Sequence, residues 1–323
     1  MADPGIKKQS LPLLSVIIPC YNEEESLPLI LDALKNVKQS MADVEFEFIL
    51  VDDGSTDATL SVIKERAALD PEIRYLSFSR NFGKEAAMLA GMETAVGGYV
   101  CIIDADMQDS PDLLPQLYEI VAGGDYDCAA VRRSDREGES RLRSFFSRKF
   151  YQIMSRMCNI EVTSGARDYR MMSRRMVDAV LSLRETVRFS KGIFAWVGFR
   201  TKWIECPNTK RIKGETKWSF FDLLLYAMDG IVSFSTKPLV LSSILGLTLC
   251  VVSVLAILFV IIRQLVWGGS AFGWPSLVCI ILFIAGIQLF CIGILGQYIA
   301  KTFSEVKRRP LYIVKEKGGG RNA

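Results

Sequence analysis

The chain has 323 residues, of which 50% are hydrophobic, and a formal net charge of +3 at neutral pH. This length suits one large domain or two ordinary domains; the net charge says little by itself, and nucleic acid is not an expected partner. The sequence contains no His, which excludes Ser-His-Asp and Cys-His hydrolases, HExxH metalloproteases and His-ligated metals. Acid, base and metal-ligand roles therefore fall mainly to Asp and Glu.

The first 26 residues do not have the pattern of a secretory signal. Their apolar run is short, and acidic residues follow it at once. The eight Cys form no CxxC pair, which is typical of small core residues in a reducing compartment rather than of disulfides or zinc ligands. We therefore expect the N-terminal part of the chain to stay in the cytosol.

Four short apolar runs, rich in Ile, Val, Phe and Tyr, recur every 26 to 32 residues or so in the first third of the chain. They predict buried strands over residues 13–19, 46–52, 73–78 and 99–105. Helical patterns lie between them, over residues 24–39, 56–69 and 83–96. This alternation predicts an α/β fold with a mostly parallel sheet and helices on both faces.

Polar residues follow each predicted strand, in the segments "PCYNEEE", "DDGSTD", "SRNFGKE" and "DADMQDSP". In parallel sheets ligands bind beyond the carboxyl ends of the strands. No GxGxxG or GxxxxGK[ST] opens any of the helices, so neither a dinucleotide fold nor a P-loop is supported. These segments predict a pocket that has carboxylates and some basic groups but no glycine-rich phosphate loop.

The segment "DADMQ" is a candidate metal site. If the strand continues through it, Asp104, Asp106 and Gln108 point the same way. Mg²⁺ and Mn²⁺ prefer such oxygen ligands, yet acid-rich turns are common and a lone DxD is weak support. Directly after it, Ser110 or Asp109 before Pro111 is expected to cap the next helix.

Two long uncharged stretches, Pro238–Ile262 and Pro275–Ala300, are each long enough to cross a bilayer as a helix. The 12 residues between them suit a tight hairpin, and the tail that follows holds seven Lys or Arg. Basic residues on both sides of the hairpin place both termini in the cytoplasm by the positive-inside rule. Small residues in the spans would allow close helix packing, which leaves a homo-oligomer open.

Two further segments suit helices in the membrane interface. Residues 140–160 interleave basic and aromatic side chains at helical spacing, and residues 218–236 are mostly apolar and precede the first span. For residues 140–160 an ordinary surface helix remains an equal alternative.

The motifs form an ordered series from "SVIIPCYNEEESL" through "FILVDDGSTDAT", "SRNFGKEAAMLAGM", "DADMQDSP" and "VTSGARDYRMMSR" to "FAWVGF" and "RIKGETKWS". With the paired spans, this series resembles the family 2 glycosyltransferases of the GT-A fold, over roughly residues 13–310. It is most similar to the polyisoprenyl-phosphate glycosyltransferases, which include dolichol-phosphate mannose synthases and bactoprenol glucosyltransferases. The two-span C-terminus favours the bacterial type, which implies a multi-pass protein of the inner membrane.

The resemblance implies roles for particular residues. It implies a donor nucleotide site and a bound Mg²⁺ or Mn²⁺ on the donor diphosphate, held by Asp106 and Gln108 with Asp104 beside them. It also implies a catalytic part for Asp104, Asp106 and Asp168, although Asp168 could instead position the acceptor, the metal or its Arg neighbours. The donor-binding residues implied are Pro19, Tyr21, Glu23, Val51, Asp53, Asp104, Ala105, Arg133 (or Arg132), Arg211 and Lys217. Asp52 is expected to be structural, because only one of two adjacent strand-end carboxylates can point into the pocket.

The implied reaction is inverting transfer of a sugar from a nucleotide sugar to a polyprenyl phosphate at the cytosolic membrane face. UDP-glucose with undecaprenyl phosphate is the first expectation, and a mannose or aminoarabinose donor is the alternative. A processive polysaccharide synthase would need a QxxRW motif and more spans, and the chain has neither. A sugar-nucleotide binding or transport component without turnover remains open.

We expect five parts along the chain. They are an N-terminal tail (1–12), a cytosolic GT-A domain (13–210), a donor-binding loop with an interfacial helix (211–237), a transmembrane hairpin (238–300) and a basic cytosolic tail (301–323).

Overall fold

The computed structural model describes residues 11–133, 165–206 apart from 187, 235–267 and 273–320, together with residues 163 and 232. Its chain divides into two compact units. The sheet unit contains the N-terminal part and residues 309–323, and the helical unit contains residues 219–308 with a short piece at 156–159. The predicted interfacial segments at 140–160 and 218–236 lie almost wholly outside the described residues.

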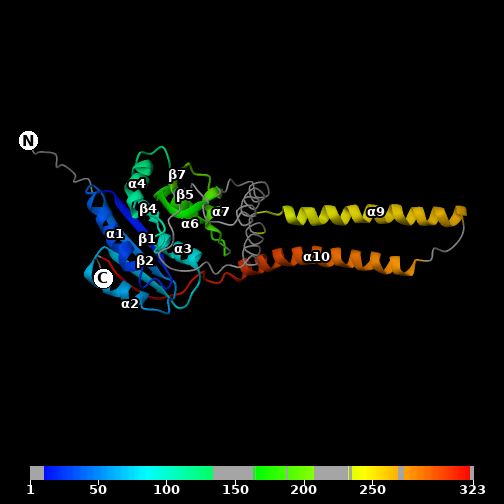
Figure 1. Ribbon diagram of the computed structural model, residues 1–323, viewed down its shortest axis with the longest axis horizontal. Coiled ribbons are helices and arrows are strands. Elements are labelled where there is room, and N and C mark those ends of the chain that lie inside the picture. The colour runs from blue at the N-terminus through cyan, green and yellow to red at the C-terminus, as the bar shows by residue number, and fades with distance from the viewer. Residues whose placement is uncertain are drawn as a thin grey trace, which may run out of the picture. The chain divides into compact units, whose positions relative to one another are not determined.

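An eight-stranded sheet forms the centre of the sheet unit (Figure 1), in the order β7-β5-β6-β4-β1-β2-β3-β8. The strands are β1 (Leu13–Cys20), β2 (Glu45–Asp52), β3 (Ile73–Phe78), β4 (Tyr99–Ile102), β5 (Cys128–Arg133), β6 (Ala166–Ser173), β7 (Thr201–Cys206) and β8 (Val314–Gly319). The four central strands are parallel, as predicted. β6 runs antiparallel to both β4 and β5, and β8 runs antiparallel to β3, so the complete sheet is mixed.

Helices cover both faces of this sheet. They are α1 (Leu27–Gln39), α2 (Thr59–Leu69), α3 (Lys84–Thr94), α4 (Leu114–Ala122) with the 3-10 turn η1 (Pro111–Leu113) before it, α6 (Arg174–Ser182) and α7 (Ser190–Trp196). Leu14, Val16 and Ile18 of β1 belong to a buried cluster shared with α1, α2 and α4. Ile17 points to the other face, under α3, where a Cβ on Gly91 would lie 2.2 Å from its Cγ2. The predicted two-sided α/β architecture is confirmed.

The fourth strand is shorter than predicted. β4 ends at Ile102, although the amide of Ile103 still donates to Ile17 O at 3.0 Å. The chain then turns, with Met107 at a φ of 57° and the amide of Gln108 donating to Asp106 Oδ1 at 3.1 Å. The strand therefore does not continue through the "DADMQ" segment, which was the condition for its three side chains to point the same way, because local hydrogen bonding replaces the strand there.

The helix cap after this turn is also resolved. Ser110 is the cap residue of η1, and its hydroxyl accepts from the amide of Asp112 at 3.4 Å. Asp109 points inward instead and forms a buried ion pair with Arg167. Of the two residues considered for the cap, Ser110 takes it.

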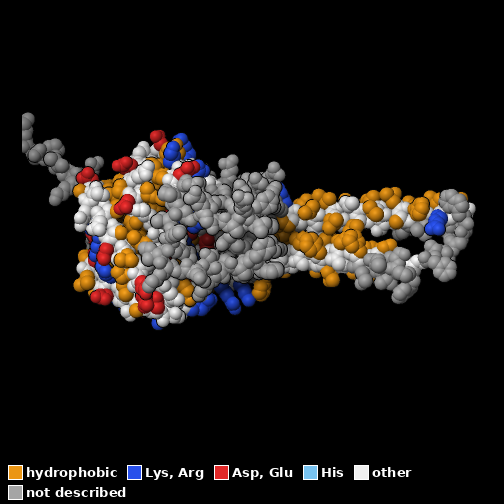
Figure 2. All heavy atoms as spheres, in the orientation of Figure 1, with side chains coloured by type: hydrophobic (Ala, Val, Ile, Leu, Met, Phe, Trp, Pro, Cys, Tyr) orange, Lys and Arg blue, Asp and Glu red, His pale blue; other side chains and the backbone are white. Residues whose placement is uncertain are grey.

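Two long helices, α9 (Lys237–Trp267) and α10 (Trp274–Lys307), make up most of the helical unit. Within them Lys237–Arg263 and Phe283–Lys307 are apolar and long enough to span a membrane. Large apolar side chains are exposed along both helices (Figure 2). The hydroxyl of Tyr298 on α10 donates to the carbonyl of Ser235, just before α9, at 2.5 Å. The helices therefore contact each other and have the composition of a membrane hairpin.

The tail beyond α10 is not a separate segment. Residues 314–319 form β8, which pairs with β3 over five residues, and the Tyr312 ring stacks on Phe78 with centroids 4.8 Å apart. Lys64 on α2 also pairs with Glu316 at 2.8 Å. The segment that the sequence predicts as a basic cytosolic tail thus contributes an edge strand to the sheet.

Candidate active site

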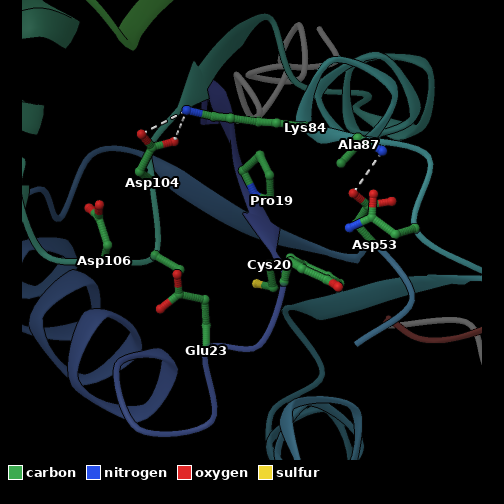
Figure 3. Close-up of a pocket in the computed structure, with 12 residues that line it drawn as sticks. Pro19, Cys20, Glu23, Asp53, Lys84, Ala87, Asp104 and Asp106 are labelled. Carbon is green, nitrogen blue, oxygen red and sulfur yellow. Dashed lines mark hydrogen bonds and ion pairs between the residues drawn. The ribbon is translucent and has the colours of Figure 1, made fainter. Parts of the chain in front are cut away.

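A cavity of about 270 Å³ lies beyond the carboxyl ends of β1, β2 and β4, beside the start of α3 (Figure 3). Polar strand-end residues form its wall, as expected for a parallel sheet. The lining residues are Pro19, Cys20, Tyr21, Glu23, Asp53, Asn81, Gly83, Lys84, Ala87, Asp104, Ala105 and Asp106.

The acidic turn after β2 orients its two carboxylates in opposite directions. Asp53 faces the cavity and accepts from the amides of Phe82 at 2.6 Å and Gly83 at 2.9 Å. Burial raises the pKa of Asp53 above its ordinary value, although these two amides oppose the shift. Asp52 is buried and accepts from Ser77 Oγ at 2.7 Å and from the amide of Ser55 at 3.0 Å. Asp52 therefore has the structural position that the sequence suggested.

The loop after β1 is tied to the loop after β2 by hydrogen bonds. Asn22, at a φ of 57°, accepts from the amide of Thr56 at 2.8 Å, and the amide of Glu23 donates to Thr59 Oγ1 at 2.8 Å. Tyr21 keeps 45% of its surface exposed at the cavity wall. Glu23 and Tyr21 are therefore placed to meet a ligand in the cavity.

A lysine joins two carboxylates of the site. Lys84 Nζ lies 2.7 Å from Asp104 Oδ1 and 2.5 Å from Asp168 Oδ2. Burial opposes the charge on the lysine, but the two carboxylates outweigh it and raise the pKa of Lys84. Burial likewise favours a neutral Asp168, yet the charges of Lys84 and Lys191 hold its pKa at about 2. At neutral pH the cluster therefore contains a charged lysine and an ionised Asp168.

The loop that carries Asp106 is held in place by Arg167 on β6. Arg167 Nη1 contacts the carboxylate of Asp109 and donates to the carbonyl of Gln108 at 2.9 Å. Both members of the ion pair are buried, with side chains 6% and 3% exposed. Asp104 and Asp106 line the cavity, whereas Gln108 does not. Two of the three predicted metal ligands, Asp104 and Asp106, therefore lie at the cavity, and the third, Gln108, comes later in the same loop and outside the lining.

The donor atoms of this loop fit a hard divalent ion. Within the described ranges, no group of three or more His, Cys, Asp or Glu could hold a metal ion. Mg²⁺ and Mn²⁺ need only one or two carboxylates when water and substrate phosphates complete the shell. Asp104 already holds a cation, the ammonium of Lys84, at one side of the cavity. Asp104 and Asp106 therefore match the ligand chemistry of such an ion.

The structure brings most of the predicted donor residues to one cavity. Val51 is completely buried in β2 and Arg133 is exposed at the end of β5, and neither is among the lining residues. Arg211 and Lys217 lie outside the described residues. The predicted donor residues that line the cavity are Pro19, Tyr21, Glu23, Asp53, Asp104 and Ala105, and Asp106 of the predicted metal set lines it as well.

Sequence reasoning missed Lys84. The segment "SRNFGKE" pointed to the correct strand end but assigned no role to its lysine. A cation at the start of a helix, opposite two acidic strand ends, was the available signal. Asn81, Gly83 and Ala87 also line the cavity and come from the same segment.

Three comparisons with known proteins bear on this geometry. The family profile described as "Glycosyl transferase family 2" matches residues 15–181. A putative glycosyltransferase, CsbB of Bacillus subtilis, is 40% identical over 304 residues, 94% of this chain and 92% of that protein. The bactoprenol glucosyl transferase of Shigella phage SfII is 38% identical, covering 95% and 99%. A prophage bactoprenol glucosyl transferase homolog of Escherichia coli is 37% identical, covering 94% and 98%.

Solved structures are more distantly similar. The mannosyltransferase PcManGT of Pyrobaculum calidifontis, in complex with GDP-Man and Mn²⁺, is 17% identical with a TM-score of 0.45, covering 93% of this chain and 89% of that one. Glucosyl-3-phosphoglycerate synthase of Mycobacterium tuberculosis, with Mn²⁺ and UDP-glucose, is 19% identical with a TM-score of 0.45, covering 68% and 77%. At this level of likeness, the ligands of those proteins say nothing about this chain.

Proposed function

Because the chain belongs to glycosyl transferase family 2 and is a glycosyltransferase, we propose that it transfers a sugar from a nucleotide sugar to a polyprenyl phosphate. The observation that carries this proposal is the Lys84-Asp104-Asp168 cluster at the wall of an acidic strand-end cavity. Two helices apolar enough to span a membrane follow in the same chain. Relatives named bactoprenol glucosyl transferase align over 94% to 95% of the chain, which supports a lipid acceptor.

The cavity residues suggest how the donor is held. The Asp53 carboxylate is fixed by two backbone amides, so its remaining acceptor capacity can be used by a ribose or base edge. Tyr21 and Glu23 are placed to contact the same nucleotide from the loop after β1. Arg211 and Lys217, with Arg133, are proposed to meet the diphosphate from the "RIKGETK" segment and the end of β5. UDP-glucose is the donor we propose first.

A divalent ion, Mg²⁺ or Mn²⁺, would be held by Asp106 and Asp104, with Gln108 as the third candidate ligand. When bound it supplies positive charge for the departing diphosphate. Lys84 keeps Asp104 in place through contacts of 2.7 and 2.8 Å to its two oxygens. The side chain of Asp104 is thereby fixed before any ligand arrives, which is the preorganisation that electrostatic catalysis needs.

The proposed reaction forms a bond between a phosphate oxygen of the lipid and the anomeric carbon of the sugar. The bond from that carbon to the nucleoside diphosphate breaks, and the configuration is inverted. A phosphate monoester is already ionised at neutral pH, so it needs little help from a base. Asp168, ionised and held by Lys84, therefore acts as a positioning group at the point of attack. Positioning and charge neutralisation supply most of the catalysis.

The helical unit is proposed to place this chemistry at the membrane. α9 and α10 would form a two-span hairpin, with both termini and the sheet unit on the cytoplasmic side of the plasma membrane. The phosphate of the lipid acceptor could then react while its polyprenyl chain stays in the bilayer. Residues 211–237 are proposed as the donor-binding loop and the interfacial helix.

A transfer assay tests the proposal. Purified protein is incubated with Mg²⁺ or Mn²⁺, undecaprenyl phosphate and a labelled UDP-sugar, and label is counted in the organic phase. We expect labelled lipid with UDP-glucose, and with a mannose or aminoarabinose donor if the sugar assignment is wrong. No labelled lipid with any of these donors would leave a non-catalytic sugar-nucleotide binding component as the explanation.

Asp106→Asn is the matched variant for this assay. It should abolish transfer and leave the urea unfolding midpoint unchanged, because Asp106 keeps an oxygen for the amide of Gln108. Asp178→Asn, on the exposed side of α6, is the control and should keep full activity. Undiminished transfer by Asp106→Asn would remove the metal assignment.

A further inference from the structure

A second cavity in the sheet unit has a volume of about 250 Å³. Part of its wall is formed by β6, the strand that carries Asp168. The cavity is also bordered by β7 and α7. Arg170 and Asp168 are two residues apart on β6 and so share one face of the strand. The principal lining residues are Arg170, Lys191, Phe194, Phe199, Thr201 and Trp203, and none of the lining residues that the structure describes is acidic. Its chemistry is thus cationic and aromatic, in contrast to the acidic donor cavity.

Arg170 is an unusual group in this wall because it is only 2% exposed. Its guanidinium donates to the carbonyl of Arg167 at 3.0 Å and lies 3.9 Å above the ring of Phe194. Burial lowers the pKa of Arg170, since nothing nearby fully offsets the lost hydration. Within the part of the chain that the structure describes, no carboxylate lies at ion-pair distance from it. A buried cation in this position is costly unless an anion joins it.

Lys191 is the second cation of the cavity, and its helix is held by a specific contact. Glu85 accepts hydrogen bonds from the amide of Ser190, at 3.1 Å, and from its hydroxyl. Glu85 directly follows Lys84 on α3, so consecutive residues hold Asp168 on one side and the start of α7 on the other. Lys191 lines the same cavity as Arg170, two residues from Asp168 on β6, and its charge contributes to the low pKa of Asp168. Both cations therefore border the proposed point of attack.

We propose that this cavity binds the phosphate monoester of the isoprenyl acceptor, with Arg170 and Lys191 on its oxygens and the three aromatic residues against the first isoprene units. This inference rests on the proposed function. A phosphate monoester carries nearly two negative charges, which the two cations Arg170 and Lys191 would match. A metal-bound diphosphate suits the cavity poorly, because none of the described residues in its lining offers a carboxylate to hold the metal. The bound phosphate would lie beside Asp168, facing the donor cavity.

Lys191→Gln is the first test, with Lys202→Gln as its matched control. Lys202 neighbours two lining residues on β7 but is exposed and does not line the cavity. Lys191→Gln should raise the KM for undecaprenyl phosphate about tenfold or more, because a charge-assisted hydrogen bond is lost, while the KM for the donor stays within about twofold. Lys202→Gln should change neither. An unchanged acceptor KM in Lys191→Gln would overturn the assignment.

Arg170→Met separates binding from a structural role. If Arg170 serves only the fold, its loss should lower the urea unfolding midpoint. If Arg170 binds the acceptor phosphate, the variant loses a buried cation that has no carboxylate partner, so the urea unfolding midpoint should stay equal or rise. The KM for undecaprenyl phosphate should rise as it does in Lys191→Gln. A lower midpoint with an unchanged acceptor KM would contradict the proposal.

Direct binding keeps this inference distinct from the proposed function. Labelled farnesyl phosphate is equilibrated with the full chain in detergent, without any donor, and farnesol and inorganic phosphate are the competitors. Binding that Lys191→Gln loses and Lys202→Gln keeps supports the cavity, even if no donor yields labelled lipid and the proposed function fails. Equal binding by both variants, or competition by farnesol as strong as by farnesyl phosphate itself, would overturn it.

Discussion

Asp109→Asn should strongly destabilise the sheet unit. The side chains of Arg167 and Asp109 are only 6% and 3% exposed. The substitution removes the carboxylate and leaves the charged Arg167 buried without its ion-pair partner. Breaking a buried ion pair from one side costs about 3–5 kcal/mol. With a urea dependence of about 2–3 kcal/mol per molar for a domain of this size, the midpoint should fall by about 1–2 M.

The assay is urea unfolding of the full chain in detergent, followed by Trp fluorescence. Replacing both partners, as Asp109→Asn with Arg167→Met, should recover most of the loss, because no buried charge then remains. Arg175→Ala is the solvated control: it removes a 2.5 Å pair with Asp127 in which the Arg side chain is 73% exposed, and should cost less than about 1 kcal/mol. The reasoning is refuted if Asp109→Asn shifts the midpoint no more than Arg175→Ala, or if the double variant is as unstable as the single one.

Two further predictions concern the donor cavity. Lys84→Met removes the charge that helps to hold the pKa of Asp168 at about 2, so this pKa should rise. The acceptor phosphate gains a proton in the acidic range with either protein, so the readout is the ratio of variant to wild-type transfer. This ratio should fall as the pH is lowered from 7 to 5, and a constant ratio would contradict the reasoning. Gly54→Ala should cost more than about 2 kcal/mol and weaken UDP binding, because Gly54 has a φ of 68° and the added Cβ would lie 2.4 Å from the carbonyl carbon of Arg80. Gly98→Ala, where nothing lies within 4 Å of the added Cβ, is the control in urea unfolding and in UDP titration.

The central sheet could be predicted because its signals are local. Each of the first four strands is a run of apolar, mainly β-branched or aromatic residues, and each run ends at a polar turn. The periodicity did not locate the end of β4. The strand ends at Ile102, but the apolar run continues through Ile103, so the sequence placed the strand end too late. The turn is stabilised by a local hydrogen bond, which the amide of Gln108 donates to the carboxylate of Asp106 two residues earlier.

The site was predictable in outline but not in its contacts. Residues such as Asp53 and Asp104 follow strands, and parallel strands bring their ends together. The bond from Lys84 to Asp168 joins residues 84 apart in sequence, and the antiparallel strand β6 that carries Asp168 has no signal in the alternation of strands and helices. Charge pairs of this kind depend on the assembled sheet, so they became visible only in three dimensions.

The position of β8 has a practical consequence for protein production. A stop codon placed before α9, in the hope of a detergent-free fragment, would also delete β8 and leave the edge of β3 bare. A bare edge strand invites intermolecular pairing and precipitation. The hairpin is better removed internally, with a flexible Gly/Ser linker in place of residues 219–308, since the sheet unit resumes at residue 309. Such a fragment would keep the strand that the end of the chain contributes.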